Sequence, residues 1–300
     1  METRRLATFV RIVDVGSLTR AADVLHIAQP ALSQQINALE ADLGQRLLIR
    51  SKQGVEPTEA GAALYRHAQV ILKQLDDAVA EVGLLGREVA GQVFVGLAPY
   101  STANLIALPL VEAVRARYPH IRLRVIDNFG LVLSEAMMTG RLHLAILYDS
   151  GPVKGLAFER LLTEELVLVC APQTAVQGDE IPIEGLADLT LMLPSPLHTI
   201  RKAVDLACDA AGVQPLVVAE LESVGLMGRA VAAGLGATLL PRSVAERLAR
   251  SSDLRLVRLA PAIEVHLSLG TPSSLPLSRA AESVRELLRH VVATTLVARA

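Results

Sequence analysis

Apolar residues recur at helical spacing along the first 44 residues and predict three helices. The first spans residues 4–15, and the second spans residues 17–26 with a short break after it. The third spans residues 29–43: Pro30 stands in its first turn, where a missing N–H costs nothing, and Gly44 follows its last residue. The apolar stripe of this third helix advances by 4, 3 and 4 residues, through Leu32, Ile36, Leu39 and Leu43.

The opposite face of the third helix is polar but uncharged. Its side chains are neutral hydrogen-bond donors and acceptors: Gln29, Ser33, Gln34 and Asn37. Ser17 or Thr19 can cap the second helix, since a hydroxyl there accepts a bond from a free backbone N–H. Two helices across a tight turn, the second with one apolar and one hydrogen-bonding face, indicate a helix-turn-helix that reads DNA.

Residues 45–58 alternate apolar and polar positions around a turn at Gly54 and predict a short hairpin. Arg50, Ser51 and Lys52 stand at the tip of this hairpin. A hairpin beside a helix-turn-helix is a wing, which can place cations on phosphates or in a minor groove.

A long helix is predicted from Thr58, with Glu59 in its first turn, where the helix dipole favours negative charge. Apolar residues then follow at alternating steps and form a heptad seam of about three repeats. The seam consists of Leu64, Ala68, Ile71, Leu75, Ala78 and Val82. An amphipathic helix on the protein's own core would show a similar pattern, but a seam directly after a small DNA-binding unit favours a dimerising helix. Gly83, Gly86 and Gly91 mark a linker.

From Gln92 the pattern changes to strands alternating with helices, which predicts a mostly parallel sheet covered on both faces. A second such unit begins near Leu161, and the chain crosses between the two units more than once, which indicates a hinged pair with a cleft. The predicted strands are 93–97, 121–126, 142–147, 166–170, 189–193, 216–219, 237–240 and 263–270. The predicted helices are 101–118, 131–138, 199–211, 223–233 and 278–297.

Composition narrows the class of protein. The chain is 51% hydrophobic, yet no apolar run reaches the roughly 18–20 residues that span a membrane. Arg11 and Asp14 interrupt the apolar N-terminal stretch, so we expect no signal peptide and a cytoplasmic protein. Cys170 and Cys208 lack the spacing of a metal site. Residues 1–57 carry seven basic and six acidic side chains, a weak electrostatic footprint for a nucleic-acid binder.

The first 65 or so positions resemble the LysR-type transcriptional regulators. The residues that carry the resemblance are FVRIVDVGSLTRAADVLHIAQPALSQQINALEADLGQRLLIR and, after a break, GVEPTEAG. Weaker similarity continues in GQVFVGLAP, GRLHLAILY, LVLVCAP and VAAGLGATLLP. Within the family, the chain looks most like the nitrogen assimilation control branch.

The resemblance implies an N-terminal all-α winged helix-turn-helix with a long linker helix, and a C-terminal α/β effector domain of two periplasmic-binding-protein-like subdomains. It assigns DNA binding to residues 1–57, the dimerising helix and hinge to 58–88, and the effector domain to 89–300. Subdomain I takes about 89–161 plus 266–300, and subdomain II about 162–265. It further implies a homodimer or dimer-of-dimers tetramer on double-stranded promoter DNA, contact with RNA polymerase, and no cofactor.

By position, the residues expected at base edges or neighbouring phosphates are Ala28, Gln29, Pro30, Ser33 and Gln34. Many members of the family carry arginine at the position of Gln34. Glutamine suits adenine rather than guanine, so the resemblance implies an altered operator preference at this position. Arg50 and Lys52 correspond to the cations of the wing.

Two helix starts in the α/β half carry hydroxyl groups, which can bind an anion together with free backbone N–H groups. In the family these places line the cleft between the subdomains, so the resemblance implies a small carboxylate effector there. The candidate contacts are Ser101, Thr102, Asn128, Pro196, His198, Thr199 and Arg201. Simpler roles compete with this hypothesis: a hydroxyl at a helix start is often a cap, and His198 is often a solvated side chain.

Two alternatives to a metabolite-sensing regulator stay open. The nitrogen assimilation branch is understood to act without a co-inducer, so the amount of protein alone could set its activity. The chain could also be a solute-binding or catalytic α/β protein whose helical N-terminus only dimerises. However, the sequence has no GxSxG, no GxGxxG after a strand, no P-loop and no i, i+4 histidine pair, so we expect no enzyme and no metal.

Overall fold

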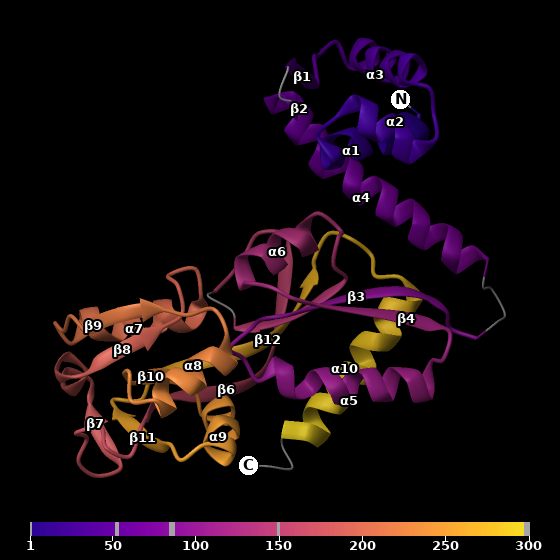
Figure 1. Ribbon diagram of the computed structural model, residues 1–300. Helices are drawn as coiled ribbons and strands as arrows, with labels where there is room; N and C mark the ends of the chain where they lie inside the picture. Colours follow the sequence, from indigo (N-terminus) through magenta and orange to yellow (C-terminus); the bar gives the residue numbers. More distant parts are fainter. Residues whose placement is uncertain (1, 52–53, 84–87, 149–150, 297–300) are drawn as a thin grey trace. The chain divides into compact units, whose positions relative to one another are not determined.

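The computed structural model of the protein describes residues 2–51, 54–83, 88–148 and 151–296. The chain divides into two compact units, one of residues 1–86 with 139–141 and one of residues 87–138 with 142–300. Figure 1 labels most of the elements of both units. Among the described residues, none of the helices is both long and apolar enough to cross a membrane.

The N-terminal unit is helical, with a two-stranded sheet between its third and fourth helices. Its elements are α1 (Thr3–Val15), α2 (Leu18–Leu25), α3 (Gln29–Leu43), β1 (Leu48–Ser51), β2 (Gly54–Pro57) and α4 (Glu59–Val82). Phe9 of α1 is fully buried together with Leu32, Ile36 and Leu39 of α3, as their spacing predicts. Leu43 is the exception: it is the last residue of α3 and is 40% exposed.

Close backbone contacts fasten the wing strands and α4 to the helix-turn-helix. The N–H of Val55 in β2 donates to the carbonyl of Gly16, in the turn between α1 and α2, at 2.9 Å. At the start of α4, the N–H of Gly61 donates to the Thr58 hydroxyl at 3.0 Å. A Cβ at Gly61 would stand 1.9 Å from the carbonyl oxygen of Leu47, so only glycine allows this approach. The wing is therefore held at a fixed place beside α2.

The C-terminal unit is a mixed α/β structure with two lobes. The first lobe contains β3 (Gly91–Leu97), α5 (Ala103–Arg117), β4 (Ile121–Asp127), α6 (Gly130–Met138), β5 (Leu144–Tyr148) and α10 (Arg279–Leu296). The second contains β7 (Glu180–Pro182), η1 (Ile183–Asp188), β8 (Thr190–Leu193), α7 (Thr199–Ala210), β9 (Leu216–Glu220), α8 (Val224–Ala232), β10 (Thr238–Pro241), α9 (Arg242–Ser251) and β11 (Arg255–Ala260). Two long strands, β6 (Leu156–Cys170) and β12 (Glu264–Pro272), belong to both lobes.

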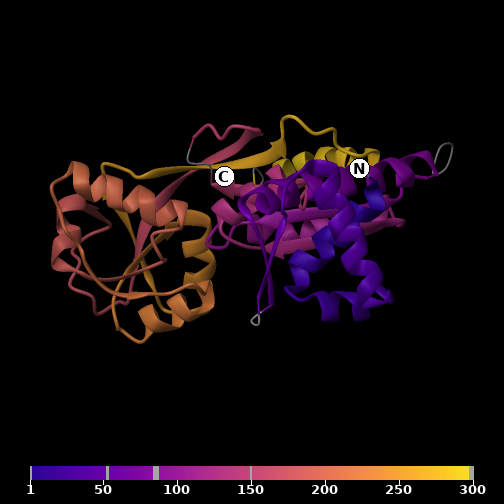
Figure 2. The ribbon, with the colours of Figure 1, turned by 90° about the horizontal axis from the view of Figure 1, so that it is seen from above.

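The long strands join the two lobes into one sheet, whose order is β4-β3-β5-β12-β6-β11-β7. β6 and β12 pair antiparallel along their length, from Glu165 opposite Glu264 to Leu156 opposite Pro272. Figure 2 shows β12 running from one lobe to the other. β10 also pairs with β6, and β8 and β9 form a separate parallel pair. Residues on β6 can therefore contact either lobe.

The observed sheet corrects the prediction of a mostly parallel one. β3 is parallel to β4 and β5, but the pairs that β12 and β6 make with β5, β10 and β11 are antiparallel, because the two crossing strands run between the lobes in opposite directions. β6 begins at Leu156 and not at Leu166, because charged residues such as Glu159 and Arg160 interrupt the apolar run that indicates a strand. β7, α9 and β11 were not predicted either.

Candidate functional site

The polar face of α3 is open to solvent. Ala28, Gln29 and Pro30 at its start are exposed, as are Gln34 and Asn37 further along, whereas Ser33 is half-buried. Within the described part of the chain, the side chains of Gln29, Ser33 and Gln34 make no hydrogen bond. An exposed face of unpaired amide and hydroxyl groups can offer donors and acceptors to base edges.

The start of α2 and the wing border the same hollow as the start of α3. This hollow has a volume of about 390 Å³ and brings together Ser17, Thr19, Gln29 and Arg50. The Ser17 hydroxyl accepts the N–H of Arg20 at 3.4 Å, which makes it the N-cap of α2, as predicted. The Arg50 guanidinium donates to Asn37 Oδ1 of α3 at 3.2 Å, so the wing is bonded to the helix beside it. Lys52, the other predicted wing cation, lies outside the described residues.

The predicted seam of α4 divides into two parts. Leu64 and Ala68 pack into the core of their own unit, where Ala68 is fully buried. Both side chains are therefore engaged by the core of their own unit. Ile71, Leu75 and Val82 are between 43% and 67% exposed, and Ala78 is exposed as well. An apolar row of this kind at the end of a helix is available to a partner.

The first predicted ligand-binding helix start, at α5, is bonded within the protein. Ser101 and Thr102 are each only 1% exposed. The Ser101 hydroxyl donates to the carbonyl of Ala98 at 2.6 Å and accepts the N–H of Ala103 at 3.1 Å, so it acts as a local cap. The Thr102 hydroxyl contacts the Glu164 carboxylate. Both hydroxyl groups are thus already satisfied.

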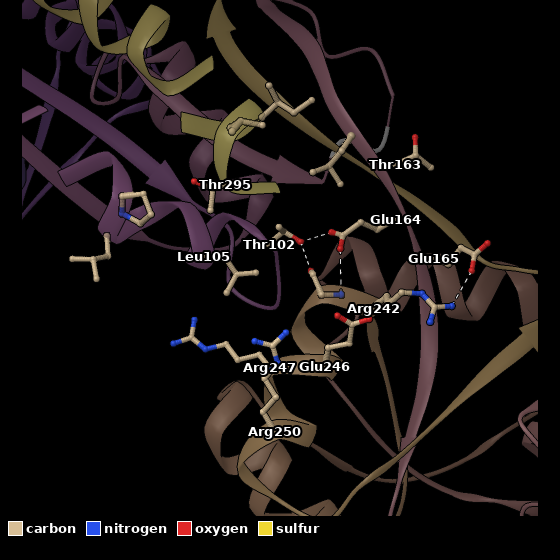
Figure 3. A pocket seen from close by; sticks show the side chains of 16 residues that line it. Thr102, Leu105, Thr163, Glu164, Glu165, Arg242, Glu246, Arg247, Arg250 and Thr295 are labelled. Atoms are coloured by element: carbon tan, nitrogen blue, oxygen red, sulfur yellow. Dashed lines mark hydrogen bonds and ion pairs between the residues drawn. The ribbon is translucent and has the colours of Figure 1, made fainter. Parts of the chain in front are cut away.

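A carboxylate from β6 is the centre of a network that joins the lobes. Glu164 accepts a hydrogen bond from Thr102, which Figure 3 marks with a dashed line. It also accepts hydrogen bonds from the Tyr148 hydroxyl at 2.6 Å and from the N–H of Ser243 at 3.4 Å. Ser243 opens α9 in the second lobe, and its hydroxyl lies 2.6 Å from that of Thr102. Burial, and then the charge of Glu164, raise the pKa of Tyr148 well above its ordinary value. Tyr148 therefore stays protonated and donates to the carboxylate.

The second predicted helix start, at α7, also contacts the first lobe. His198 is 5% exposed, contrary to its interpretation as a solvated residue. Its Nε2 lies 2.9 Å from a Glu222 carboxylate oxygen. Its ring meets those of Tyr100 and Phe129 edge-on, with centroids 5.3 and 4.8 Å away. The Thr199 hydroxyl donates to the carbonyl of Tyr148 at 3.2 Å.

The remaining candidate contacts differ in their surroundings. The Arg201 guanidinium is paired with Asp205 at 2.8 Å and with Glu220 at 3.3 Å. Asn128 Oδ1 accepts the N–H of Phe129 at 2.9 Å. Pro196 is exposed. Thr102 and Thr199 thus contact the same residue at two places, the hydroxyl of Tyr148 and its backbone carbonyl. Arg201 is engaged by two carboxylates of its own lobe.

Comparison with known proteins gives the family. Residues 3–62 match the model of the bacterial regulatory helix-turn-helix protein of the lysR family, and residues 86–293 match the LysR substrate binding domain. The chain belongs to the LysR family of transcriptional regulators. This LysR-type protein is thus a DNA-binding transcriptional regulator, and its family is one of regulators and not of enzymes.

Two curated relatives of this LysR-type regulator match over nearly the full length. The nitrogen assimilation regulatory protein nac of Escherichia coli (strain K12) is 41% identical over 298 residues, which cover 99% of this chain and 97% of the relative. The nac protein of Klebsiella aerogenes is 40% identical over 293 residues, with 97% and 95% covered. The predicted likeness to the nitrogen assimilation branch is confirmed.

Solved structures support the fold of the LysR-type chain. A full-length OxyR variant from Pseudomonas aeruginosa superposes with a TM-score of 0.75 at 24% identity, covering 99% of this chain and 96% of that one. Full-length CbnR complexed with its target DNA gives 0.69 at 24% identity, covering 97% of this chain and 100% of that one. Both superpositions cover nearly the whole chain and therefore show a shared fold.

Sequence reasoning missed the residues that bind the predicted cleft together. Glu164 and Ser243 were not considered, because one lay outside the predicted strand and the other opens a helix that was not predicted. Tyr148 and Glu222 were missed because their partners lie on other elements. Only the pairing of Arg201 with Asp205 had a local signal, the i, i+4 spacing on one helix.

Proposed function

We propose that this LysR-type regulator is of the nitrogen assimilation type: it binds promoter DNA through α3 and the wing, and needs no anionic co-inducer in the cleft between its lobes. The protein binds DNA as a dimer or a dimer of dimers, joined through the exposed row of Ile71, Leu75 and Val82. It acts with RNA polymerase. The 41% identity to a nitrogen assimilation regulatory protein supports this function.

The Glu164 network is the observation that supports the absence of an anionic co-inducer. A carboxylate effector was expected to bind the Thr102 hydroxyl, but a carboxylate of the chain itself is already bonded there. Its bonds to Tyr148 of the first lobe and Ser243 of the second hold the lobes together, as an added ligand would. At the other helix start, His198 and Arg201 are paired with carboxylates as well. An added anion would meet repulsion from Glu164, Glu220 and Glu222 and would find no unpaired cation among these contacts.

The test is chemical rescue of a Glu164→Ala variant. Removing the carboxylate leaves a space at Thr102 and Ser243 that acetate can enter, so acetate should raise the unfolding temperature of the variant in a saturable way. The wild-type protein should respond to acetate no more than to chloride at equal ionic strength. Glu165→Ala is the matched control, because Glu165 is the next residue on β6 and pairs with Arg242 at the surface.

A saturable stabilisation of the wild-type protein by acetate or a dicarboxylate would contradict the proposal. The functional arm is transcription from a target promoter with purified protein. Activity should be full without any added metabolite and should rise with protein concentration alone. If transcription required small molecules from a cell extract, the proposal that no co-inducer is needed would be overturned. Loss of DNA binding in a Gln29→Ala variant would still support the proposal that α3 binds DNA.

A further inference from the structure

Asn37 and Glu40 of α3 both bond to the wing. They stand three residues apart, and therefore on one side of the helix. Asn37 Oδ1 accepts a bond from the Arg50 guanidinium at 3.2 Å. One carboxylate oxygen of Glu40, Oε1, accepts the backbone N–H of Leu47 at 2.7 Å and that of Leu48 at 3.3 Å. The helix that carries the DNA-reading face therefore also holds the first strand of the wing.

The bonds of Glu40 lie at the base of the wing, where the chain leaves α3 and enters β1. Leu48 is the first residue of β1, and the side chains of Leu47 and Leu48 are both buried. The N–H of Thr58, the residue before α4, donates to the carbonyl of Leu47 at 2.9 Å. A charged acceptor makes a backbone hydrogen bond stronger than a neutral acceptor does. The base of β1 is therefore fixed between α3 and the start of α4.

The two anchors on α3 differ in what DNA binding does to them. The bond to Asn37 uses the guanidinium of Arg50, which is also the group that a phosphate would bind. Glu40 instead holds backbone N–H groups, for which a phosphate at Arg50 does not compete. Arg50 lies two residues beyond Leu48, about 7 Å along the strand, so its position follows from that of the base of β1. Glu40 can thus hold the wing while Arg50 contacts DNA.

The charge of Glu40 has the wrong sign for a direct contact with DNA. Its carboxylate is negative, and a negative charge close to phosphates weakens the binding of DNA. The residue is also half-buried against the wing that it bonds to. A carboxylate at this place can favour DNA binding only through the geometry of the wing.

We propose that Glu40 is a positioning residue for DNA binding: it holds the base of the wing so that Arg50 reaches a phosphate. This inference rests on the proposed function, in which α3 and the wing bind DNA, and it names a residue of α3 that acts through another residue. A hydrogen bond to a phosphate needs its two atoms about 2.7–3.2 Å apart, so a small displacement of the wing removes the contact.

The experiment measures the affinity of the full-length protein for a labelled duplex of mixed sequence over a range of salt concentrations. The slope of log affinity against log salt reports the number of phosphate contacts. Arg50→Gln should reduce this slope by about 1, and Glu40→Ala should reduce it by the same amount. The double variant should show no further reduction, because both changes remove the same contact. Glu40→Gln should keep the wild-type slope, because its amide oxygen can accept both N–H groups.

Two further variants separate position from charge. Glu40→Asp keeps the charge but is shorter by one methylene, so it should reduce the slope as Glu40→Ala does. Asp42→Ala is the matched control, because Asp42 is an acidic residue of the same helix and pairs with Arg5 of α1 at 3.1 Å, not with the wing. Removing its charge should not weaken DNA binding. Circular dichroism checks that each variant is folded, and the contrast of Glu40→Asp with Glu40→Gln holds even if Glu40→Ala does not fold.

Three results would overturn the proposal and leave the proposed function standing. They are a wild-type slope for both Glu40→Ala and Glu40→Asp, a reduction that adds to that of Arg50→Gln, and an equal reduction with Asp42→Ala. An unchanged slope for Arg50→Gln would instead contradict the proposed function of the wing, and this inference would fail with it.

Discussion

The polar face of α3 and the predicted cleft contain similar residue types in opposite states. On α3, Gln29 and Gln34 are exposed and Ser33 is half-buried, and the three side chains have no hydrogen-bond partner among the described residues. In the cleft, Thr102 and His198 are almost fully buried and bonded to carboxylates of the same chain. A polar group left open is available to a ligand, whereas one bonded in the interior stabilises the fold. The difference teaches that residue type at a helix start does not by itself predict a binding site.

The two regions also differ in how they use charge. The N-terminal unit has few cations to hold phosphates: Arg50 is steadied by Asn37, and Arg20 donates to the carbonyl of Val15 at 3.0 Å. In the cleft, by contrast, carboxylates are bonded to Thr102, His198 and Arg201. Binding of DNA must therefore rely on a few positioned contacts and not on a strongly basic surface.

The largest expected effect is a loss of stability on substitution in the cleft. Glu164→Ala should lower the free energy of unfolding by about 3 kcal/mol, because it leaves the Tyr148 hydroxyl, the Thr102 hydroxyl and the N–H of Ser243 without their acceptor. Gln34→Ala on α3 should change it by less than about 0.5 kcal/mol, since its side chain is exposed and unbonded.

Chemical denaturation of both variants measures this contrast, and Glu165→Ala serves as the control on β6. A loss for Gln34→Ala as large as that for Glu164→Ala would mean that the open face of α3 is structural. If Glu164→Ala left the free energy of unfolding unchanged, the network would contribute nothing to joining the lobes.

The sequence predicted the α3 face but not the cleft network, for a physical reason. Which residues of a helix face solvent follows from its own period, so the exposure of Gln29 and Gln34 is a local property. The Glu164 network joins Thr102 to Ser243, and these residues meet only because the antiparallel crossing of β6 and β12 brings the lobes together. The order of strands and helices was largely predicted, whereas the direction of the crossing strands was not.

The next expected effect would sharpen the role of the open face. Gln34→Arg should move the preferred base at one operator position from adenine toward guanine, with a change in discrimination of about 1–3 kcal/mol, because arginine is a bidentate donor to guanine. Binding constants for operators that differ at single positions measure it. Ala41→Arg is the control: it adds the same charge at an exposed position near the end of α3 and should not alter base preference. An equal change of preference with both variants would mean that charge alone acts.

A smaller effect is expected from the wing. Arg50→Gln should weaken binding to all DNA sequences alike and reduce the slope of log affinity against log salt by about 1, the contribution of one phosphate contact. Measurement of affinity over a range of salt concentrations tests this. Arg66→Gln, an exposed arginine on α4, should leave the slope unchanged. If Arg50→Gln instead altered base preference, Arg50 would act by positioning Asn37 on the DNA-reading face of α3 and not by contacting a phosphate.

The smallest effect concerns acid stability of the cleft. Burial raises the pKa of Glu222, but hydrogen bonds from Ser195 and His198 outweigh it, so the pKa lies below the ordinary value of 4.5. A carboxylate with a lowered pKa contributes stability that is present above its unfolded pKa and is lost as the pH falls through its folded pKa. Wild-type protein should therefore exceed Glu222→Gln in free energy of unfolding at about pH 6, and the difference should shrink below about pH 4.5. The difference should be small, since the Glu222 side chain is 46% exposed and solvent screens it.

Ser195→Ala removes one of the donors and should show a smaller loss in the same pH range. If this difference in free energy of unfolding stayed constant as the pH fell, the charge of Glu222 would not contribute to stability at this helix start.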